Sequence, residues 1–222
     1  MILTVRAVED PAPLAARIER LEWRDGRATA GATAKAVKRN LQAVLKGREG
    51  EALHGDLLGL VADNPVVKAA AQPRRFSRLL LSRTEDGGHY GAHVDNALMG
   101  TGEERMRTDI SFTLFLSPPE DYEGGELVVY AAGMTQWIKP QAGELVLYPS
   151  SSIHEVRPVT KGARVACVGW IESWIADPSQ REMLFDLENL RVSLRASLPR
   201  QSAELLTLDK TIANLLRMWG RR

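Results

Sequence analysis

The central part of the chain, residues 75–175, alternates short β-prone runs with glycine and proline, and this pattern limits the possible folds most strongly. In Thr108–Ser117, apolar side chains at every second position alternate with Ser111 and Thr113. About seven or eight short strands at this spacing are typical of a sandwich or barrel, such as a jelly roll. The expected strands are Arg75–Ser82, Thr108–Ser117, Glu126–Tyr130, Met134–Lys139, Glu144–Tyr148, Ile153–Val156 and Ala163–Glu172.

The first part of the chain, residues 1–74, shows helical spacing instead. Apolar residues recur there at intervals of three and four in three stretches. Asn64-Pro65 adds a typical helix start, a capping residue followed by proline. We expect a helical region that packs on the β core. Its apolar positions are Leu14, Ile18 and Leu21, then Val37, Leu41, Val44 and Leu45, then Leu53, Leu57, Leu58 and Val61.

The last part, residues 176–222, returns to helical spacing. Asp177-Pro178 is a further cap-plus-proline start, and the leucine-rich segment that follows continues to Trp219. The sequence therefore predicts an α+β protein with three regions, 1–74, 75–175 and 176–222, in which N- and C-terminal helices flank a jelly-roll core. The leucine-rich helices could pack on the core, or they could leave an apolar stripe through which the chain forms a homo-oligomer.

Length and charge narrow the function classes. A chain of 222 residues is long enough to bury a core and shape a cleft. Its 29 basic and 28 acidic residues give a net charge of +1, which excludes the strong basic field of a general nucleic-acid binder. No apolar run approaches a membrane span, and the first ten residues contain no signal-peptide pattern. We expect a cytoplasmic protein without nucleic-acid or membrane partners.

The single cysteine, Cys167, excludes an internal disulfide framework and any zinc site built on several cysteines. It lies in an apolar, β-prone run, which favours a small buried core residue over a nucleophile. A reducing compartment suits this use of cysteine.

Three of the four histidines fall in the β region. His93 and Asp95 form a His-x-Asp pair, and residues two apart on an extended segment project to the same side. An imidazole and a carboxylate can therefore reach a single ion, although this pair alone is a weak signal. We expect His89 to be a rim or surface residue and His54, in the helical region, to be a solvated surface residue.

His154 strengthens the signal, because it lies on a separate expected strand. Two histidines and one carboxylate are the ligand set of non-haem Fe(II) oxygenases. Arg164 follows ten residues later, after a turn at residues 158–162. We expect an antiparallel hairpin to bring Arg164 alongside the strand that bears His154. An arginine directed into an apolar barrel needs an anion, which a dicarboxylate co-substrate would supply.

Several motifs carry a resemblance to a known family. The segment Tyr90–Asn96 is similar to the first motif of the prolyl-hydroxylase branch of the Fe(II)/2-oxoglutarate dioxygenases. The segments Arg107–Ser111, Tyr122–Leu127 and Leu147–His154 closely resemble the bacterial PKHD-type hydroxylases, a group often linked with iron uptake. The resemblance covers most of the chain, and it implies a double-stranded β-helix with one Fe(II), 2-oxoglutarate and O₂, and ascorbate (vitamin C) as a reductant.

The resemblance also implies roles for four residues. His93, Asp95 and His154 would hold the iron, and Arg164 would bind the distal carboxylate of 2-oxoglutarate. The protein would then hydroxylate a C–H bond while 2-oxoglutarate is decarboxylated to succinate. No further catalytic residue is assigned.

Three questions stay open at this point. Similar sites also perform desaturation or demethylation. A non-catalytic module that binds or senses metal on a jelly-roll scaffold is a second interpretation, which Arg164 argues against, because a pure metal holder has no use for it. The substrate could be a protein side chain, a free amino acid or an iron-chelating, siderophore-like small molecule.

Tyr90, Tyr148 and Arg83 could line the pocket, but each is more typical of packing.

Overall fold

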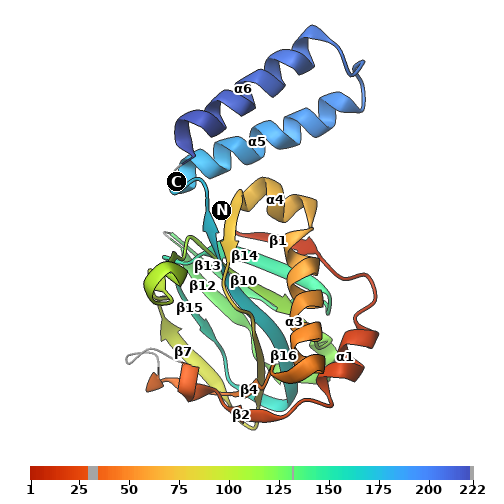
Figure 1. Cartoon of the computed structure of the whole chain (residues 1–222). Helices are drawn as coiled ribbons and strands as arrows, with labels where there is room; N and C mark the ends of the chain where they lie inside the picture. Colours follow the sequence, from red (N-terminus) through yellow and green to blue (C-terminus); the bar gives the residue numbers. More distant parts are fainter. Residues whose placement is uncertain (30–34, 132, 221–222) are drawn as a thin grey trace.

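Two antiparallel sheets form a jelly-roll core, with helices packed outside it (Figure 1). The computed structural model describes residues 1–29, 35–131 and 133–220. The α+β class predicted from the sequence is confirmed. Among the described residues, no helix combines the length and the apolar character that crossing a membrane requires.

The large sheet has the strand order β1-β14-β10-β16-β6-β4-β2, and β11 and β5 also pair with β16. The strand β16 is 15 residues long and lies between β10 and β6. It therefore joins the two halves of this sheet. The strands are β1 (Leu3–Arg6), β2 (Trp23–Asp25), β4 (Leu41–Ala43), β5 (Pro73–Phe76), β6 (Leu80–Glu85), β10 (Ile110–Phe115), β11 (Tyr122–Gly124), β14 (Glu144–Pro149) and β16 (Val159–Ser173).

The small sheet has the order β13-β12-β15-β7-β3. A separate two-stranded ribbon is formed by β8 and β9. These strands are β3 (Lys38–Arg39), β7 (His89–His93), β8 (Leu98–Met99), β9 (Met106–Arg107), β12 (Leu127–Ala131), β13 (Met134–Ile138) and β15 (Ile153–Val156). Short 3₁₀ helices cover Gly26–Thr29, Gly102–Glu104 and Pro119–Asp121.

The two faces of β10 point to different parts of the molecule, one to the helices and one to the space between the sheets. Phe112 and Leu114 are fully buried on the face that packs against helices, and Cys167 of β16 joins the same cluster, as predicted. Burial raises the pKa of the Cys167 thiol to about 12, which keeps it protonated. On the other face, Phe115 packs toward the small sheet, and Ser111 and Thr113 point into the space between the sheets.

The helices α1 (Ala12–Ile18), α3 (Gly47–Ala62) and α4 (Pro65–Ala71) cover the outer face of the large sheet (Figure 1). In α3, Leu53, Leu57 and Val61 recur every four residues and are almost completely buried. Burial of each such side chain contributes about 1.5–3 kcal/mol. The expected start of α4 is confirmed, because Asn64 accepts hydrogen bonds from the first backbone N–H groups of that helix.

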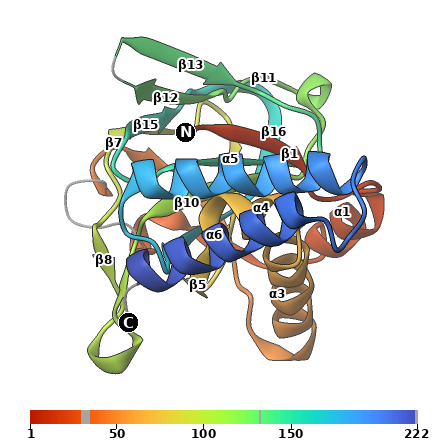
Figure 2. The same cartoon turned by 90° about the horizontal axis from the view of Figure 1, so that it is seen from above.

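The C-terminal helices α5 (Pro178–Arg195) and α6 (Ala203–Trp219) form a hairpin over α4 (Figure 2). The predicted cap is confirmed, since Asp177 accepts a hydrogen bond from Gln180 N. Arg181 fixes the base of the hairpin, because its buried guanidinium donates to the carbonyls of Ile175 and Ala176.

Two predictions about secondary structure are wrong. The helix expected through Val37–Leu45 is instead the strand pair β3 and β4, and the region 1–74 contributes strands to both sheets. The apolar spacing fits a helix, but β3 pairs with β7 at the edge of the small sheet and β4 pairs with β2 and β6 in the large sheet. This backbone pairing overrides local preference. The single strand expected over Arg75–Ser82 is divided into β5 and β6. The division into three regions stays a prediction.

Candidate functional site

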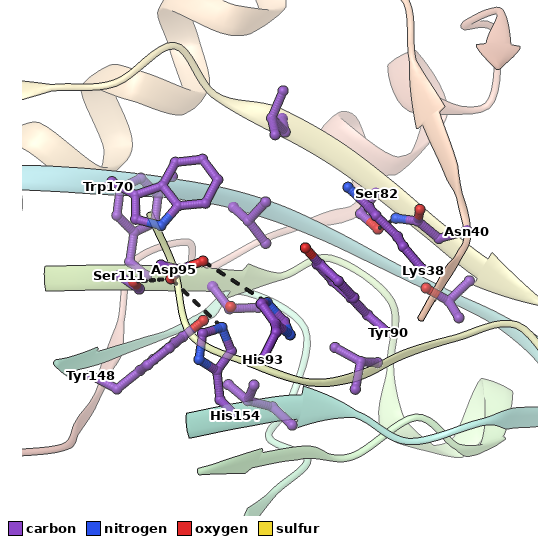
Figure 3. Close-up of a pocket in the computed structure, with 18 of the residues that line it drawn as sticks. Lys38, Asn40, Ser82, Tyr90, His93, Asp95, Ser111, Tyr148, His154 and Trp170 are labelled. Carbon is purple, nitrogen blue, oxygen red and sulfur yellow. Dashed lines mark hydrogen bonds and ion pairs between the residues drawn. The ribbon is translucent and has the colours of Figure 1, made fainter. Parts of the chain in front are cut away.

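A pocket with about 110 Å³ of free space lies between the two sheets. Its lining includes His93, Asp95, His154 and Arg164, the four residues predicted from the sequence. Figure 3 shows the two histidines and Asp95 in the middle of this pocket, with Lys38 and Tyr90 on one side and Tyr148 and Trp170 on the other.

The small sheet places the two histidines directly opposite each other. His93 ends β7, and it pairs across the antiparallel ladder with His154 of β15. Asp95 follows β7 by two residues, and its carboxylate lies 3.9 Å from His93 Nε2 and 3.6 Å from His154 Nε2. One potential ligand atom from each residue lies within 4.8 Å of the others, so the three residues, called the triad from here on, could hold one metal ion.

Hydrogen bonds to the backbone orient both rings. His93 Nδ1 lies 2.8 Å from the Gly91 carbonyl, and His154 Nδ1 lies 3.0 Å from the Ser152 carbonyl. Each Nδ1–H therefore donates to the carbonyl two residues upstream, which leaves the Nε2 lone pair for a metal. Burial, with the neighbouring His154, holds the pKa of His93 below its usual range and keeps the ring neutral.

The carboxylate of Asp95 is held by the large sheet. Ser111 Oγ donates to Asp95 Oδ2 at 2.6 Å and lies 2.8 Å from Ser150 Oγ, which can donate in turn. This contact was not predicted. Its only signal in the sequence is the polar position of Ser111 in the alternating strand β10.

Two tyrosines pack directly on the imidazoles. The Tyr90 ring stacks on His93 with a centroid distance of 3.7 Å, and the Tyr148 ring meets His154 edge-on at 5.0 Å. Burial raises the pKa of Tyr90 to about 12, so its hydroxyl stays protonated. Both residues therefore line the pocket as well as packing.

Arg164 reaches the pocket from the opposite sheet. The hairpin expected between the strands of His154 and Arg164 does not form, because β15 lies in the small sheet and β16 in the large one. The chain crosses between the sheets after Val156, so that Arg164 faces the triad across the pocket instead of lying beside His154.

The guanidinium of Arg164 is buried without a counter-charge. Its exposed fraction is 1%, and its Nε and one terminal nitrogen have no hydrogen-bond partner among the described residues. It lies 4.7 Å over the Phe115 ring, and burial lowers its pKa. The buried hydroxyl of Tyr122, which interacts electrostatically with Arg164, is also unpartnered within the described part of the chain.

Gly125 makes room for this pair of donors. Its φ of +70° suits glycine, and a Cβ there would lie 3.1 Å from Arg164 Cδ and 3.0 Å from the Tyr122 ring. A buried cation and a buried hydroxyl that lack partners are costly unless an anion or acceptor satisfies them. This end of the pocket, which we call the Arg164 end, therefore fits a carboxylate group.

Another side of the pocket is a polar wall that was not predicted. Lys38, Asn40 and Gln42 line it, from β3, the connection after it, and β4; we call these three residues the β3–β4 wall. Lys38 Nζ lies 5.0 Å from the centre of the Tyr90 ring. Asn40 Nδ2 donates to Ser82 Oγ at 2.6 Å, which ties the wall to β6.

Trp170 also lines the pocket. The sequence does not predict this position, because the five tryptophans are scattered along the chain. Its buried Nε1–H has no partner among residues 1–29, 35–131 and 133–220. Arg83 does not line this pocket and pairs with Glu85, which agrees with the expected packing role.

The other two histidines lie outside this pocket. His54 is not a solvated surface residue, because its Nε2 accepts a hydrogen bond from Leu79 N at 3.1 Å and links α3 to the large sheet. His89 is partly buried on β7, where its Nδ1 lies 3.3 Å from the Gly87 carbonyl.

Two regions of the chain match known protein families. Residues 79–172 match the model of the 2OG-Fe(II) oxygenase superfamily, and residues 179–220 match the PKHD-type hydroxylase C-terminal domain. A PKHD-type hydroxylase of Hyphomonas neptunium is 52% identical over 207 residues, which cover 93% of this chain and 92% of that protein. Another, from Synechococcus elongatus, is 48% identical over 223 residues, with 99% and 100% covered.

A solved structure supports the fold. The prolyl hydroxylase of Trichoplax adhaerens, solved with a peptide fragment of the hypoxia inducible factor oxygen degradation domain, superposes with a TM-score of 0.56 at 15% identity. The superposition covers 78% of this chain and 83% of that one. From the two matching regions and the relatives that align over nearly its whole length, the chain belongs to the PKHD-type hydroxylases of the 2OG-Fe(II) oxygenase superfamily.

Proposed function

We propose that the protein hydroxylates a C–H bond with Fe(II), 2-oxoglutarate and O₂, with the triad holding the iron and Arg164 holding the distal carboxylate of 2-oxoglutarate. Bound Fe(II) would supply the oxidising chemistry, coupled to decarboxylation of 2-oxoglutarate to succinate. Two neutral imidazoles and one carboxylate are the donor set typical of such iron sites. Ascorbate as a reductant and a cytoplasmic location are parts of this proposal.

The observation that carries the proposal is the unpartnered guanidinium of Arg164 in the same pocket as the triad. A protein that only stores or senses a metal gains nothing from this buried charge, whereas a co-substrate with a second carboxylate neutralises it. Tyr122 supplies a further hydroxyl donor, and the Phe115 ring supports the flat face of the guanidinium.

The remaining pocket residues have supporting roles. The Gly91 and Ser152 carbonyls and Ser111 fix the orientation of the three ligands before metal arrives. The apolar side chain of Leu127, which is almost completely buried, limits access of water to the space between the sheets. The triad is itself nearly buried, with side-chain exposures of 5–8%.

The substrate class in this proposal is a small molecule or a peptidyl group. Self-association through the C-terminal hairpin is also proposed, because Leu190, Val192 and Leu206 are exposed on α5 and α6. Sedimentation of the protein and of Val192→Glu checks this point: a single monomeric species for both proteins would contradict it.

The function is tested without oxygen and without a substrate. Fe(II) is added to the purified protein, 2-oxoglutarate follows, and the visible charge-transfer band of the chelate is recorded. We expect a band that needs both additions. In Arg164→Ala, we expect at least a tenfold higher 2-oxoglutarate requirement, since a charge-assisted contact contributes about 1.5–3 kcal/mol.

The matched control is Arg83→Ala. Arg83 lies on β6, the strand paired with β16, but its side chain pairs with Glu85 and does not line the pocket. This variant should saturate with 2-oxoglutarate as the unchanged protein does. Metal binding without any band would exclude the oxygenase function and favour a metal-holding module instead.

A further inference from the structure

The β3–β4 wall presents alternate residues of one extended segment to the pocket. Lys38, Asn40 and Gln42 are two residues apart, so their side chains project to the same side, while Arg39 is exposed on the other. Lys38 and Gln42 are each 7% exposed. Three polar side chains of one segment thus border the pocket.

The strands of the two histidines lie between Lys38 and the segment next to Arg164. The small sheet has the order β12, β15, β7 and β3, and the segment leading into β12 carries Gly125, where a Cβ would lie 3.1 Å from Arg164 Cδ. His154 lies on β15, His93 on β7 and Lys38 on β3. Figure 3 shows Lys38 on one side of the two histidines and Tyr148 on the other. A co-substrate held by Arg164 next to β12 therefore leaves Lys38, on the edge strand β3, to another molecule.

Lys38 brings a positive charge close to the reacting centre. Its ammonium lies over one face of Tyr90, and His93 stacks on that ring, so one aromatic ring separates the ammonium from a metal-ligating imidazole. Ammonium groups that are removed from water are stabilised by anions. A lysine has three donors, so it can bind an incoming anion in addition to contacts within the chain.

We propose that Lys38 recognises the substrate through an anionic group, a carboxylate in the simplest case, and so directs a neighbouring C–H bond toward the triad. This inference rests on the proposed function and specifies its substrate class as an acid. The amide groups of Asn40 and Gln42 border the same space and hydrogen-bond polar atoms next to the acid group. The Tyr90 ring fixes the direction of approach, because it separates the acid group from His93.

Burial agrees with this role. It lowers the pKa of Lys38 to about 8, while the charges of Asp25 and Asp95 oppose that shift. An anion that binds next to the ammonium would favour its charged form and remove part of the desolvation cost.

The test uses pairs of probes that have similar shapes and differ in charge. The small pair is butanoate and butanamide, and the peptide pair is a capped glycyl-aspartyl-glycine and its asparaginyl analogue. Each is titrated into the anaerobic protein saturated with Fe(II) and 2-oxoglutarate, and the perturbation of the charge-transfer band gives its affinity. We expect the acid of at least one pair to bind about tenfold more tightly than its amide.

Variants then connect this preference to one side chain. Lys38→Met should abolish the acid preference, Lys38→Arg should retain most of it, and the exposed neighbour Arg39→Ala should leave it unchanged. In all three variants 2-oxoglutarate should saturate the band as it does in the unchanged protein, which also shows that the pocket is folded. Preference within the small pair alone identifies a free acid as substrate, and preference within the peptide pair alone identifies an acidic side chain.

Three results overturn the inference. The first is equal behaviour of acid and amide in both pairs, including no binding of either. The second is an acid preference that survives in Lys38→Met. The third is a 2-oxoglutarate requirement that rises in Lys38→Met, which would mean that the ammonium binds the co-substrate. If no band forms at all, the proposed function fails and this inference fails with it; if the band forms without discrimination, only the role of Lys38 is lost.

Discussion

The Arg164 end of the pocket and the β3–β4 wall differ in how the chain builds them. Arg164 extends from the middle of the long strand β16, which is paired on both sides, and its surroundings are fully buried. The β3–β4 wall consists of two short strands joined at Asn40: β3 is an edge strand of the small sheet, and β4 lies between β6 and the edge strand β2 of the large sheet. One end is therefore rigid and enclosed, and the other is a boundary that a few substitutions can alter.

The difference indicates a division of work. A co-substrate that every member of a superfamily shares is best bound in the central strands, where the sheet fixes each side chain. A substrate that differs from one enzyme to another is best bound at an edge strand, because substitutions there disturb few backbone hydrogen bonds. Variants of the triad, of the Arg164 end and of the β3–β4 wall test this division.

The largest effect is expected at the triad itself. Asp95→Ala should abolish succinate formation, because it removes the carboxylate proposed as the third metal ligand, while the far-ultraviolet circular dichroism stays unchanged. Asp186→Ala, which alters an exposed carboxylate on α5, is the control. Turnover by Asp95→Ala at the level of this control would show that both ends of the pocket serve some other centre.

A smaller effect is expected behind the triad. Ser111→Ala removes the hydroxyl that donates to Asp95 at 2.6 Å, and we expect the dissociation constant for Fe(II) to rise about 10–100-fold. Ser150→Ala should have a weaker effect, because Ser150 acts on Asp95 only through Ser111. Metal titration of both variants checks the order, and a stronger effect for Ser150→Ala would contradict the relay.

At the Arg164 end, Tyr122→Phe removes one buried hydroxyl and keeps the ring. We expect KM for 2-oxoglutarate to rise about fivefold with kcat nearly unchanged, since a neutral hydrogen bond contributes about 1 kcal/mol. Steady-state kinetics at varied 2-oxoglutarate measures both constants. A fall in kcat at unchanged KM would place the hydroxyl near the reacting atoms rather than near the distal carboxylate.

At the β3–β4 wall, the smallest effect is a dependence on pH. The pKa of Lys38 is lowered to about 8, so affinity for the acidic probes should be constant below that value and fall as pH rises through it and above, where the ammonium loses its proton. The charged or titratable groups that act near it are Tyr90, His93, Asp25 and Asp95. The pKa of Tyr90 is about 12, so its hydroxyl keeps its proton through this range.

Lys38→Arg distinguishes this titration from any other. A guanidinium stays charged throughout this range, so the affinity of that variant for the acidic probes should not change with pH. A parallel fall in both proteins would assign the titration to another group and weaken the contrast between the two ends.

Sequence reasoning succeeded where chemistry and strand alternation coincide. The polar face of β10, with Ser111 and Thr113, follows directly from period-two alternation, and the four pocket residues follow from the combination of two histidines, one carboxylate and one arginine. Arg164 was expected in the pocket through a hairpin that does not exist. Arg164 nevertheless lines the pocket, because an arginine in an apolar strand requires an anion whichever sheet carries it.

No comparable signal in the sequence indicates the wall or the buried donors. The apolar spacing of Val37, Leu41, Val44 and Leu45 fits a helix, and pairing with strands 40 to 52 residues away makes this segment extended. The unpartnered groups of Tyr122 and Trp170 are equally invisible, because their burial depends on contacts between distant segments.

The position of β16 also governs the order of assembly during synthesis. It is the only strand in the described large sheet that connects the half β1-β14-β10 to the half β6-β4-β2. When residue 158 leaves the ribosome, all three triad residues have been made, yet the sheet is still two separate pieces with open edges at β6 and β10. Such edges are slow to find distant partners and prone to aggregate. The proposed metal site is therefore not enclosed between two complete sheets until β16 has been added up to Ser173.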